Sequence, residues 1–344
     1  MTMAERLHAD LVLEGGGVKG IGLVGAYTAL IEAGYRIHRI AGTSAGAIVG
    51  ALIGADMPPD LMVKTMREVN YGAFQDEGFL DHLGRVGKGL SILFEKGIYE
   101  GEYLRTWLDG LLTDLGKATF GDLRVDDPGS SLPAEQSYRL VVLTSDISCG
   151  RLLRLPWDYR LYGLDPDAQR VSDAVRASMS IPFFYEPVRF KGRRPDGTKI
   201  DSYLVDGGML SNFPISLFDR TDGEPPRWPT FGIKLSARPV EPLEERFHIN
   251  GVLDLAKAMV GTMTRFYDQM HIDDPAARAR TMFVDTLGVK ATDFDIDETI
   301  QDRLYDNGRV AATKFLHGDD DHEAWSFERY VAKYRTKPGQ LQRA

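Results

Sequence analysis

The sequence has almost no cysteine and no long apolar run. Its single cysteine, Cys149, rules out a scaffold held together by intrachain disulfides. The longest uncharged stretch, residues 40–55, is shorter than a membrane span and rich in glycine and alanine. The first ten residues lack the apolar segment of a secretory signal. We therefore expect a cytoplasmic or peripheral membrane protein, although secretion without a signal peptide is compatible with this sequence.

Basic residues are also in deficit. The 344 residues carry 41 Lys and Arg against 50 Asp and Glu, a formal net charge of -9. Nucleic acid is excluded as a partner because its binding requires a basic face. The same balance argues against polybasic attachment to anionic membranes. Since neither an H-E-x-x-H motif nor an EF-hand loop is present, we expect no metal and no cofactor.

Short apolar strands alternate with helical patterns along the chain, which predicts an α/β fold with a mostly parallel central sheet in three α/β/α layers. We expect one catalytic unit over residues 8–220, with a cap-like insertion at about 71–135. Residues 221–344 would continue the same domain and be mostly helical. The expected strands are 10–14, 35–42, 138–147, 230–236 and 281–286, and the expected helices are 18–33, 45–55, 59–70 and 250–267.

The first predicted strand leads into the glycine loop "GGGVKG", residues 15–20, which satisfies G-x-G-x-x-G. A dinucleotide site is disfavoured because the second strand ends without an acidic residue, and a P-loop because the G-K-[ST] ending is missing. A glycine turn that opens a helix still presents several backbone N–H groups to an anion, including an oxyanion. The alternative is a strand-to-helix turn that needs only flexible glycines.

The second predicted strand ends in a G-x-S-x-G sequence formed by Gly42, Ser44 and Gly46. This spacing between a strand and a helix predicts a nucleophile elbow, in which Ser44 projects from a strained turn. The flanking residues must be tiny to avoid the neighbouring backbone, and the N–H of Ala45 can donate to an oxyanion. The alternative is a serine that only caps the helix N-terminus.

A serine nucleophile needs a base. None of the seven histidines has the expected context: His8, His38 and His82 fall outside the Ser–Asp–His order, and His248, His271, His317 and His322 occur in helical or charged surroundings. Asp206, at a predicted strand end and followed by Gly207 and Gly208, is the better candidate. A Ser–Asp dyad is chemically sufficient if the carboxylate reaches the hydroxyl. The alternative is a simple Asp-Gly turn.

Taken in order, these elements resemble the patatin-like phospholipase family. The resemblance extends to Lys19 within the glycine loop, to the segment "ASMSIPFF" containing Pro182, and to the Asn212 and Pro214 that follow Asp-Gly-Gly. It covers residues 11 to about 215. It implies a serine lipid acyl hydrolase of the phospholipase A or lysophospholipase type, acting on phospholipid or another acyl lipid through transient membrane contact.

The resemblance also implies a role for each motif residue. Ser44 would attack the ester carbonyl and Asp206 would take its proton. The oxyanion hole would be formed by the glycine loop with the start of the following helix, from Gly15, Gly16, Gly17, Val18 and Ala45. Gly15 and Gly20 would mainly shape the turn. Lys19 would attract a lipid phosphate or, as we prefer, balance charge near Glu14.

Several further assignments remain as alternatives. Aromatic and apolar residues near the motifs could line an acyl channel or belong to the core: Phe183, Phe184, Tyr185, Met209, Leu210 and Phe213. We expect the Met-rich stripe of 250–267 to be core, and 79–99 to be the lid or membrane-contact segment. Competing functions are an acyltransferase or a neutral-lipid or thioester hydrolase with the same dyad, and a phosphate- or nucleotide-binding protein. The sequence identifies no activator.

Overall fold

The computed structural model describes residues 7–68, 101–193, 196–235, 274–291, 296–320 and 323–335, together with Asp293 and isolated positions between 249 and 262. The strands are β1 (Leu7–Leu13), β2 (Tyr35–Thr43), β3 (Leu140–Asp146), β4 (Arg151–Leu155), β5 (Val188–Arg193), β6 (Lys199–Asp206), β7 (Thr230–Lys234) and β8 (Thr281–Phe283). The α-helices are α1 (Gly20–Glu32), α2 (Ala45–Gly54), α3 (Pro59–Glu68), α5 (Glu102–Asp114), α6 (Val171–Ser178), α8 (Pro275–Arg278), α9 (Glu298–His317) and α10 (Phe327–Tyr334).

The short 3-10 helices of the described residues lie in the connections. They are η1 (Gly17–Lys19), η4 (Gly121–Leu123), η5 (Ala134–Gln136), η6 (Trp157–Tyr162) and η7 (Gly207–Met209). Two of them matter for the site, because η1 follows the first strand and η7 follows β6.

The strands form one mixed sheet in the order β5-β6-β3-β2-β1-β7-β8, with β4 paired to β3. The pairs β1–β2, β2–β3, β1–β7 and β7–β8 are parallel, whereas β3–β4, β3–β6 and β5–β6 are antiparallel. The expected strands are all present. The strands β4 and β5 were not expected from the sequence; together with β6 they form an antiparallel region beside the parallel one.

Two strands meet end to end along β3. Its first half pairs with β2, through Thr43 opposite Leu143, and its second half pairs with β6, through Asp206 opposite Thr144. Because β4 pairs with β3 at both of these positions, β2 and β6 must share the opposite edge. The carboxyl ends of β2 and β6 therefore face each other, one residue apart in the register of β3.

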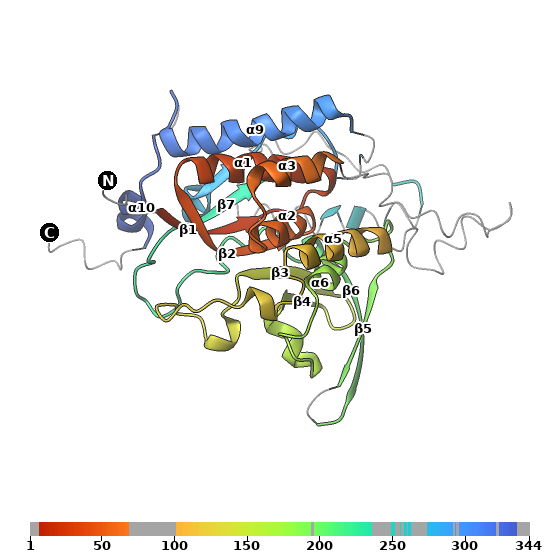
Figure 1. Cartoon of the computed structure of the whole chain (residues 1–344). Helices are drawn as coiled ribbons and strands as arrows, with labels where there is room; N and C mark the ends of the chain where they lie inside the picture. Colours follow the sequence, from red (N-terminus) through yellow and green to blue (C-terminus); the bar gives the residue numbers. More distant parts are fainter. Residues whose placement is uncertain are drawn as a thin grey trace.

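Helices lie on both sides of this sheet, so the α/β prediction is confirmed. In Figure 1, α1, α3 and α9 lie together above the sheet, whereas α5 and α6 lie beside β3 and β6. Every residue of α2 is buried. Its sequence, "AGAIVGALIG", permits this because glycines let the helix approach the strands closely: a Cβ on Gly50 would lie 3.1 Å from Ile40 Cγ2.

The C-terminal part of the chain contributes to the same sheet and helical layer. Strand β7 pairs with β1, and α9 packs on α1. Backbones approach closely at that helix contact, because a Cβ on Gly25 would lie 2.0 Å from the Tyr305 carbonyl oxygen and one on Gly308 would lie 2.0 Å from that of Gly22. In the described part of the chain, no helix is both long and apolar enough to cross a membrane.

One expectation from the sequence has a different outcome, and another lies outside the described residues. Met259, assigned to the core stripe, is 60% exposed. The helical spacing of the apolar residues predicts which side chains share a face with Met259. It does not determine whether that face packs against the protein. Most of the rest of that stripe lies outside the described residues, as does the proposed lid or membrane-contact segment 79–99.

Two glycine substitutions should have opposite effects, one at the α1–α9 contact and one at an open position of α5. Gly25→Ala places a methyl group against the α9 backbone and should lower the free energy of unfolding by about 1–3 kcal/mol. Gly110→Ala, in the interior of α5 with nothing within 4 Å of the new Cβ, should raise it by about 0.5–1 kcal/mol. Urea unfolding at constant pH measures both. Shifts of the same sign in the two variants would contradict this packing.

Candidate active site

Ser44 sits in a strained turn between β2 and α2. Its backbone has φ 53° and ψ -124°, a conformation that costs free energy for any residue with a side chain. The side chain is only 4% exposed, and its hydroxyl makes no capping hydrogen bond to α2. The helix-cap alternative is therefore not supported by the geometry.

The glycines around Ser44 are required sterically. A Cβ on Gly42 would lie 2.2 Å from the Gly46 carbonyl oxygen, and a Cβ on Gly46 would lie 2.4 Å from that of Leu13. These distances are far below van der Waals contact, and the obstructing atoms are backbone. The turn can therefore form only with glycine at both positions.

Asp206 ends β6 beside this turn and is 7% exposed. Burial raises its pKa to about 6, opposed by the Gly208 N–H, which donates to Oδ1 over 2.7 Å, and by hydrogen bonding to the Ser44 side chain. The turn is not an Asp-Gly reversal with left-handed glycine, because neither Gly207 nor Gly208 has a positive φ. Gly207 is needed instead because a Cβ would lie 2.4 Å from the Leu143 carbonyl oxygen.

A segment at the end of α6 holds both residues. The Ser44 N–H donates to Ser178 Oγ over 2.9 Å, and that hydroxyl donates to the Leu143 carbonyl oxygen over 2.6 Å. Two residues later, the Ser180 carbonyl accepts the Asp206 N–H over 2.9 Å. The Ser44 hydroxyl lies 3.3 Å from Met179 Sδ. In the sequence, this segment is marked only by the family resemblance, because contacts between such distant residues have no local signature.

The glycine loop borders the serine. A Cβ built on Gly15 would lie 3.0 Å from Ser44 Cβ and 2.2 Å from Asn212 Oδ1. Asn212 ties the loop down, because its Nδ2 donates to the Gly15 carbonyl over 3.2 Å and its own carbonyl accepts the Gly15 N–H at 3.4 Å. Its Oδ1 would also lie 2.9 Å from a Cβ on Gly208, so it spans both loops.

The backbone donors of the predicted oxyanion hole have different surroundings. The Val18 N–H donates to the Ala291 carbonyl over 3.2 Å, and the Gly15 N–H donates to the Asn212 carbonyl over 3.4 Å. Both N–H groups therefore already have an acceptor within the protein. In the described residues, the N–H groups of Gly16 and Gly17 donate to no protein acceptor. The Ala45 N–H opens α2, where no intrahelical acceptor exists. The contact with Ala291 is not visible from sequence spacing.

Charge near the glycine loop is balanced by a residue that the sequence did not indicate. The carboxylate of Glu14 is ion-paired with Lys234 and accepts the Leu235 N–H, and both charged side chains are at most 3% exposed. The Nζ of Lys19 donates to the Leu235 carbonyl over 3.3 Å. Lys19 therefore fastens the loop to the end of β7, which agrees with a structural role.

Two motif positions prove less constrained than expected. Gly20 has φ -53°, and a Cβ there would meet nothing closer than Met66 Cε at 3.4 Å, so no steric demand for glycine exists. Pro182 is half-buried at the start of the turn that follows Ser180. Of the proposed acyl-channel residues, Tyr185 and Phe213 are buried at 1% exposure, and the other four are half-buried: Phe183, Phe184, Met209 and Leu210.

None of the described histidines is placed to act as the base. His8 and His38 hydrogen-bond to each other over 2.6 Å in β1 and β2, with His38 six residues before Ser44 along its strand. Burial lowers the pKa of His38 to about 4. His317 ends α9 and is exposed. His82, His248, His271 and His322 lie outside the described residues.

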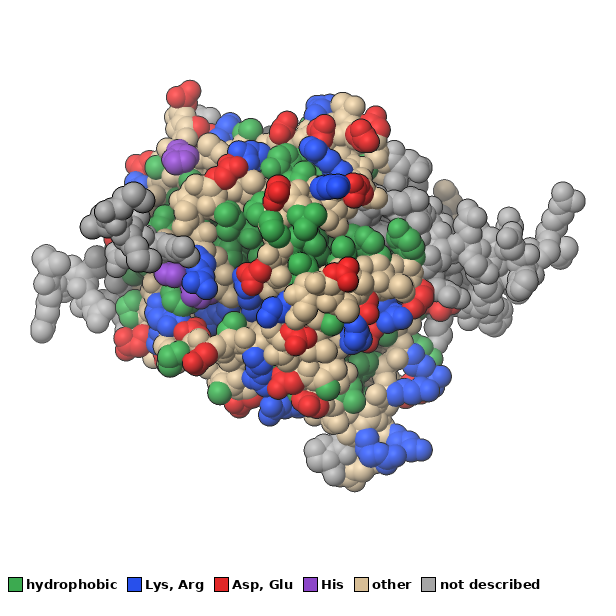
Figure 2. All heavy atoms as spheres, viewed as in Figure 1, with side chains coloured by type: hydrophobic (Ala, Val, Ile, Leu, Met, Phe, Trp, Pro, Cys, Tyr) green, Lys and Arg blue, Asp and Glu red, His purple; other side chains and the backbone are tan. Residues whose placement is uncertain are grey.

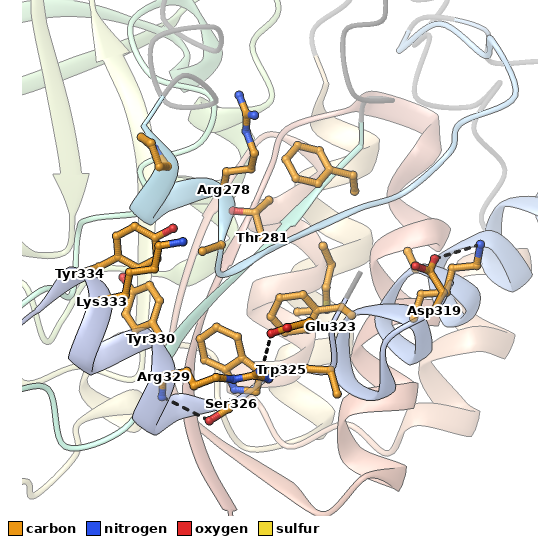
Figure 3. Close-up of a pocket in the computed structure, with 18 of the residues that line it drawn as sticks. Arg278, Thr281, Asp319, Glu323, Trp325, Ser326, Arg329, Tyr330, Lys333 and Tyr334 are labelled. Carbon is orange, nitrogen blue, oxygen red and sulfur yellow. Dashed lines mark hydrogen bonds and ion pairs between the residues drawn. The ribbon is translucent and has the colours of Figure 1, made fainter. Parts of the chain in front are cut away.

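A large cavity of about 950 Å³ lies elsewhere, between β8, α9 and α10. Figure 3 shows Trp325, Tyr330 and Tyr334 along its wall, with Arg278 and Thr281 on the opposite side. Neither Ser44, nor Asp206, nor the glycine loop lines it. This cavity is therefore separate from the candidate site. Within the described ranges, no group of three or more metal-ligating side chains converges.

Comparison with known proteins gives consistent matches. A family model described as patatin-like phospholipase matches residues 11–219. The uncharacterised protein YqhO of Bacillus subtilis is 34% identical over 310 residues, 90% of this chain and 98% of that protein. The uncharacterised NTE family protein Rv2565 of Mycobacterium tuberculosis is 30% identical over 215 residues, 62% of this chain and 29% of that protein.

Two solved structures are more distant. VipD from Legionella pneumophila is 18% identical with a TM-score of 0.48, over 89% of this chain and 66% of that one. The type III effector protein ExoU is 17% identical with a TM-score of 0.45, over 89% of this chain and 52% of that one. The chain thus spans between half and two thirds of these two proteins.

The raised pKa of Asp206 predicts a pH-dependent cost to folding. Its folded pKa of about 6 exceeds the unfolded value of 3.8, so the native state binds this proton more tightly. The associated stability is fully present below pH 3.8 and is lost as the pH rises through 6. Relative to wild type, Asp206→Asn should therefore gain about 2 kcal/mol between pH 4 and pH 7.5, at about 1.36 kcal/mol per pH unit between the two pKa values.

Urea unfolding at the two pH values measures this difference. The Asn side chain keeps an oxygen for the Gly208 N–H, so the variant should remain folded. A stability difference that is the same at pH 4 and pH 7.5 would show that the pKa of Asp206 is not raised.

Proposed function

Since this chain belongs to the patatin-like phospholipase family, we propose that it is a serine lipid acyl hydrolase of the phospholipase A or lysophospholipase type, in which Ser44 and Asp206 form the catalytic dyad. One observation carries the proposal. Ser44, in the strained β2–α2 turn, lies beside the buried carboxylate of Asp206 because β2 and β6 end opposite adjacent residues of β3, and interaction with Ser44 opposes the rise in the Asp206 pKa that burial causes. A carboxylate with a pKa near neutrality is suited to accept and return a proton.

The first half of the reaction forms an acyl-enzyme. The Oγ of Ser44 attacks the ester carbonyl carbon, and its proton passes to Asp206. When the tetrahedral intermediate collapses, the C–O bond to the leaving alcohol breaks, and Asp206 returns the proton to that alcohol. Only the deprotonated Asp206 can act as the base. Since its pKa is about 6, the dyad is in its active form above about pH 6.

The negative oxygen of the intermediate needs donors that are already in place. Gly16 and Gly17 supply N–H groups without a protein acceptor in the described residues, on a loop that borders Ser44. The Ala45 N–H lies at the N-terminus of α2, where the helix dipole contributes positive potential. Lys19, Asn212 and Ala291 hold the loop in its position.

The second half releases the fatty acid. Asp206 takes a proton from water, the resulting hydroxide adds to the acyl carbonyl carbon, and the bond to Ser44 Oγ breaks as the serine recovers its proton. An alcohol in place of water would make the same acyl-enzyme an acyltransferase. The family and the half-buried apolar side chains beside the site favour an acyl-lipid ester as the substrate.

Lipid products provide the decisive test. Wild type incubated without calcium with vesicles of mixed phospholipids should release fatty acid and lysolipid, measured by mass spectrometry. Ser44→Ala and Asp206→Asn should each lose at least about 10³-fold in rate, as removal of a nucleophile or its base does in hydrolases. His317→Ala, at an exposed site, is the matched control and should keep wild-type activity.

Each outcome of that experiment has a definite meaning. Equal release by wild type and Ser44→Ala would remove Ser44 as the nucleophile. Transfer of the acyl group to an added alcohol or lysolipid, in preference to water, would change the reaction type to acyl transfer while keeping the dyad.

Two alanine substitutions test the glycine loop separately from the dyad. Gly17 has φ +57°, and a Cβ would lie 1.8 Å from the Ala291 carbonyl oxygen, so Gly17→Ala must displace the loop. We expect kcat to fall by about 10²–10³, the usual cost of a lost oxyanion donor, with KM little changed. Gly20→Ala, in the same loop but without a clash, should retain kcat. Steady-state kinetics on a soluble ester compare them, and wild-type kcat in Gly17→Ala would contradict the proposed hole.

A further inference from the structure

The strands β5 and β6 form a hairpin that projects from the body of the protein (Figure 1). One face of the hairpin is packed against η6. Phe190 contacts the rings of Tyr159 and Tyr162 at centroid distances of 5.7 and 4.8 Å, and a Cβ on Gly192 would lie 2.3 Å from the Tyr162 carbonyl oxygen. Strand residues alternate between faces, so the residues between these point the other way.

The opposite face is strongly basic. The register pairs Arg189 with Tyr203, Lys191 with Asp201, and Arg193 with Lys199, which places all six residues on that face. The four cations are exposed. In Figure 2, Lys and Arg side chains gather on the projection at the lower right, where Figure 1 shows this hairpin.

These cations are only partly neutralised within the protein. Arg189 forms a two-pronged ion pair with Asp201, including an Nε–Oδ1 distance of 2.7 Å. Among the described residues, Lys191, Arg193 and Lys199 have no ion pair with a carboxylate. Three unneutralised cations on one flat surface stand out in a chain whose formal net charge is -9.

We propose that the outer face of the β5–β6 hairpin is a docking surface for an anionic lipid bilayer. Charge complementarity supports a lipid surface as the occupant, because among the described residues this face presents three cations without an ion pair along two adjacent strands, with Tyr203 next to them. Tyrosine is favoured at the boundary between lipid headgroups and water. The use of this surface for catalysis rests on the proposed lipid substrate, but its existence does not.

The local charge outweighs the overall charge at short range. At physiological salt, fields are screened beyond about 8 Å, so repulsion from acidic residues on distant faces is weak at the bilayer. Each Lys or Arg near an anionic surface contributes about 1 kcal/mol. Removal of two cations should then weaken binding by about 25-fold, since 1.4 kcal/mol corresponds to a factor of ten.

The surface is also directly linked to the dyad. Strand β6 begins at Lys199, continues through Asp201 and Tyr203, and ends at Asp206. At about 3.3 Å per residue, the charged pairs lie within roughly 25 Å of the proposed base along a single strand. A bilayer held by the hairpin is therefore held by the element that delivers Asp206.

Vesicle binding tests this surface without requiring activity. The Ser44→Ala variant would be sedimented with phosphatidylcholine vesicles that contain either no phosphatidylglycerol or about 30%, so that the vesicles are neutral or anionic. Binding should require phosphatidylglycerol and should fall about 25-fold in Lys191→Ala/Lys199→Ala. The control Lys64→Ala/Lys314→Ala removes the same charge from exposed positions on α3 and α9 and should bind like its parent.

A second measurement separates docking from catalysis. With Ser44 restored, the hairpin double variant should keep wild-type kcat/KM on a short soluble ester and lose activity only on anionic vesicles. Equal vesicle binding by the hairpin and control variants would overturn the proposal. So would binding that is independent of phosphatidylglycerol, or hairpin-dependent binding to duplex DNA that is tighter than binding to vesicles. If no variant hydrolyses any ester, the proposed function fails, but the vesicle-binding result still decides the docking surface.

Discussion

The site depends on one topological constraint: β2 and β6 end against each other along the same edge of β3. Thr43 and Asp206 pair with adjacent residues of β3, so the hydrogen bonds of the sheet bring Ser44, the proposed nucleophile, close to the Asp206 carboxylate. The proposed dyad therefore requires no histidine supplied by a separate loop. The constraint also explains the local glycines, because three chain segments converge where there is space for backbone only.

Such convergence stores unfavourable free energy in the native state. Ser44 has a strained backbone, Asp206 is an ionisable group held away from water, and Glu14 and Lys234 are buried as a pair beside the glycine loop. The surroundings compensate with the fully buried strand β3 and helix α2, and with Ser178 and Ser180, which accept hydrogen bonds from the backbone N–H groups of Ser44 and Asp206. Strain at a functional site that is supported by a rigid frame is a general property of enzymes.

Sequence reasoning predicted the parts of this arrangement that depend on local pattern. The first three strands, the G-x-S-x-G turn and the Asp-Gly-Gly turn each have a short signature, because their backbone geometry restricts nearby residues. The roles of Ser178, Asn212 and Lys234 had no such signature, since each acts on a residue more than 130 positions away. The hairpin strand β5 was missed because three of its six residues are basic, a composition that fits an exposed face better than a core strand.

The sheet order has a consequence for how the chain can be divided. The segment that matches the family model ends at residue 219, whereas β7, which covers the outer edge of β1, begins at Thr230. In the described structure, a fragment cut at that boundary would leave the backbone of Leu11, Val12 and Leu13 as an open, wholly apolar strand edge. Such edges recruit other chains. In the described structure, the residues that follow the matched segment therefore close this edge of the sheet.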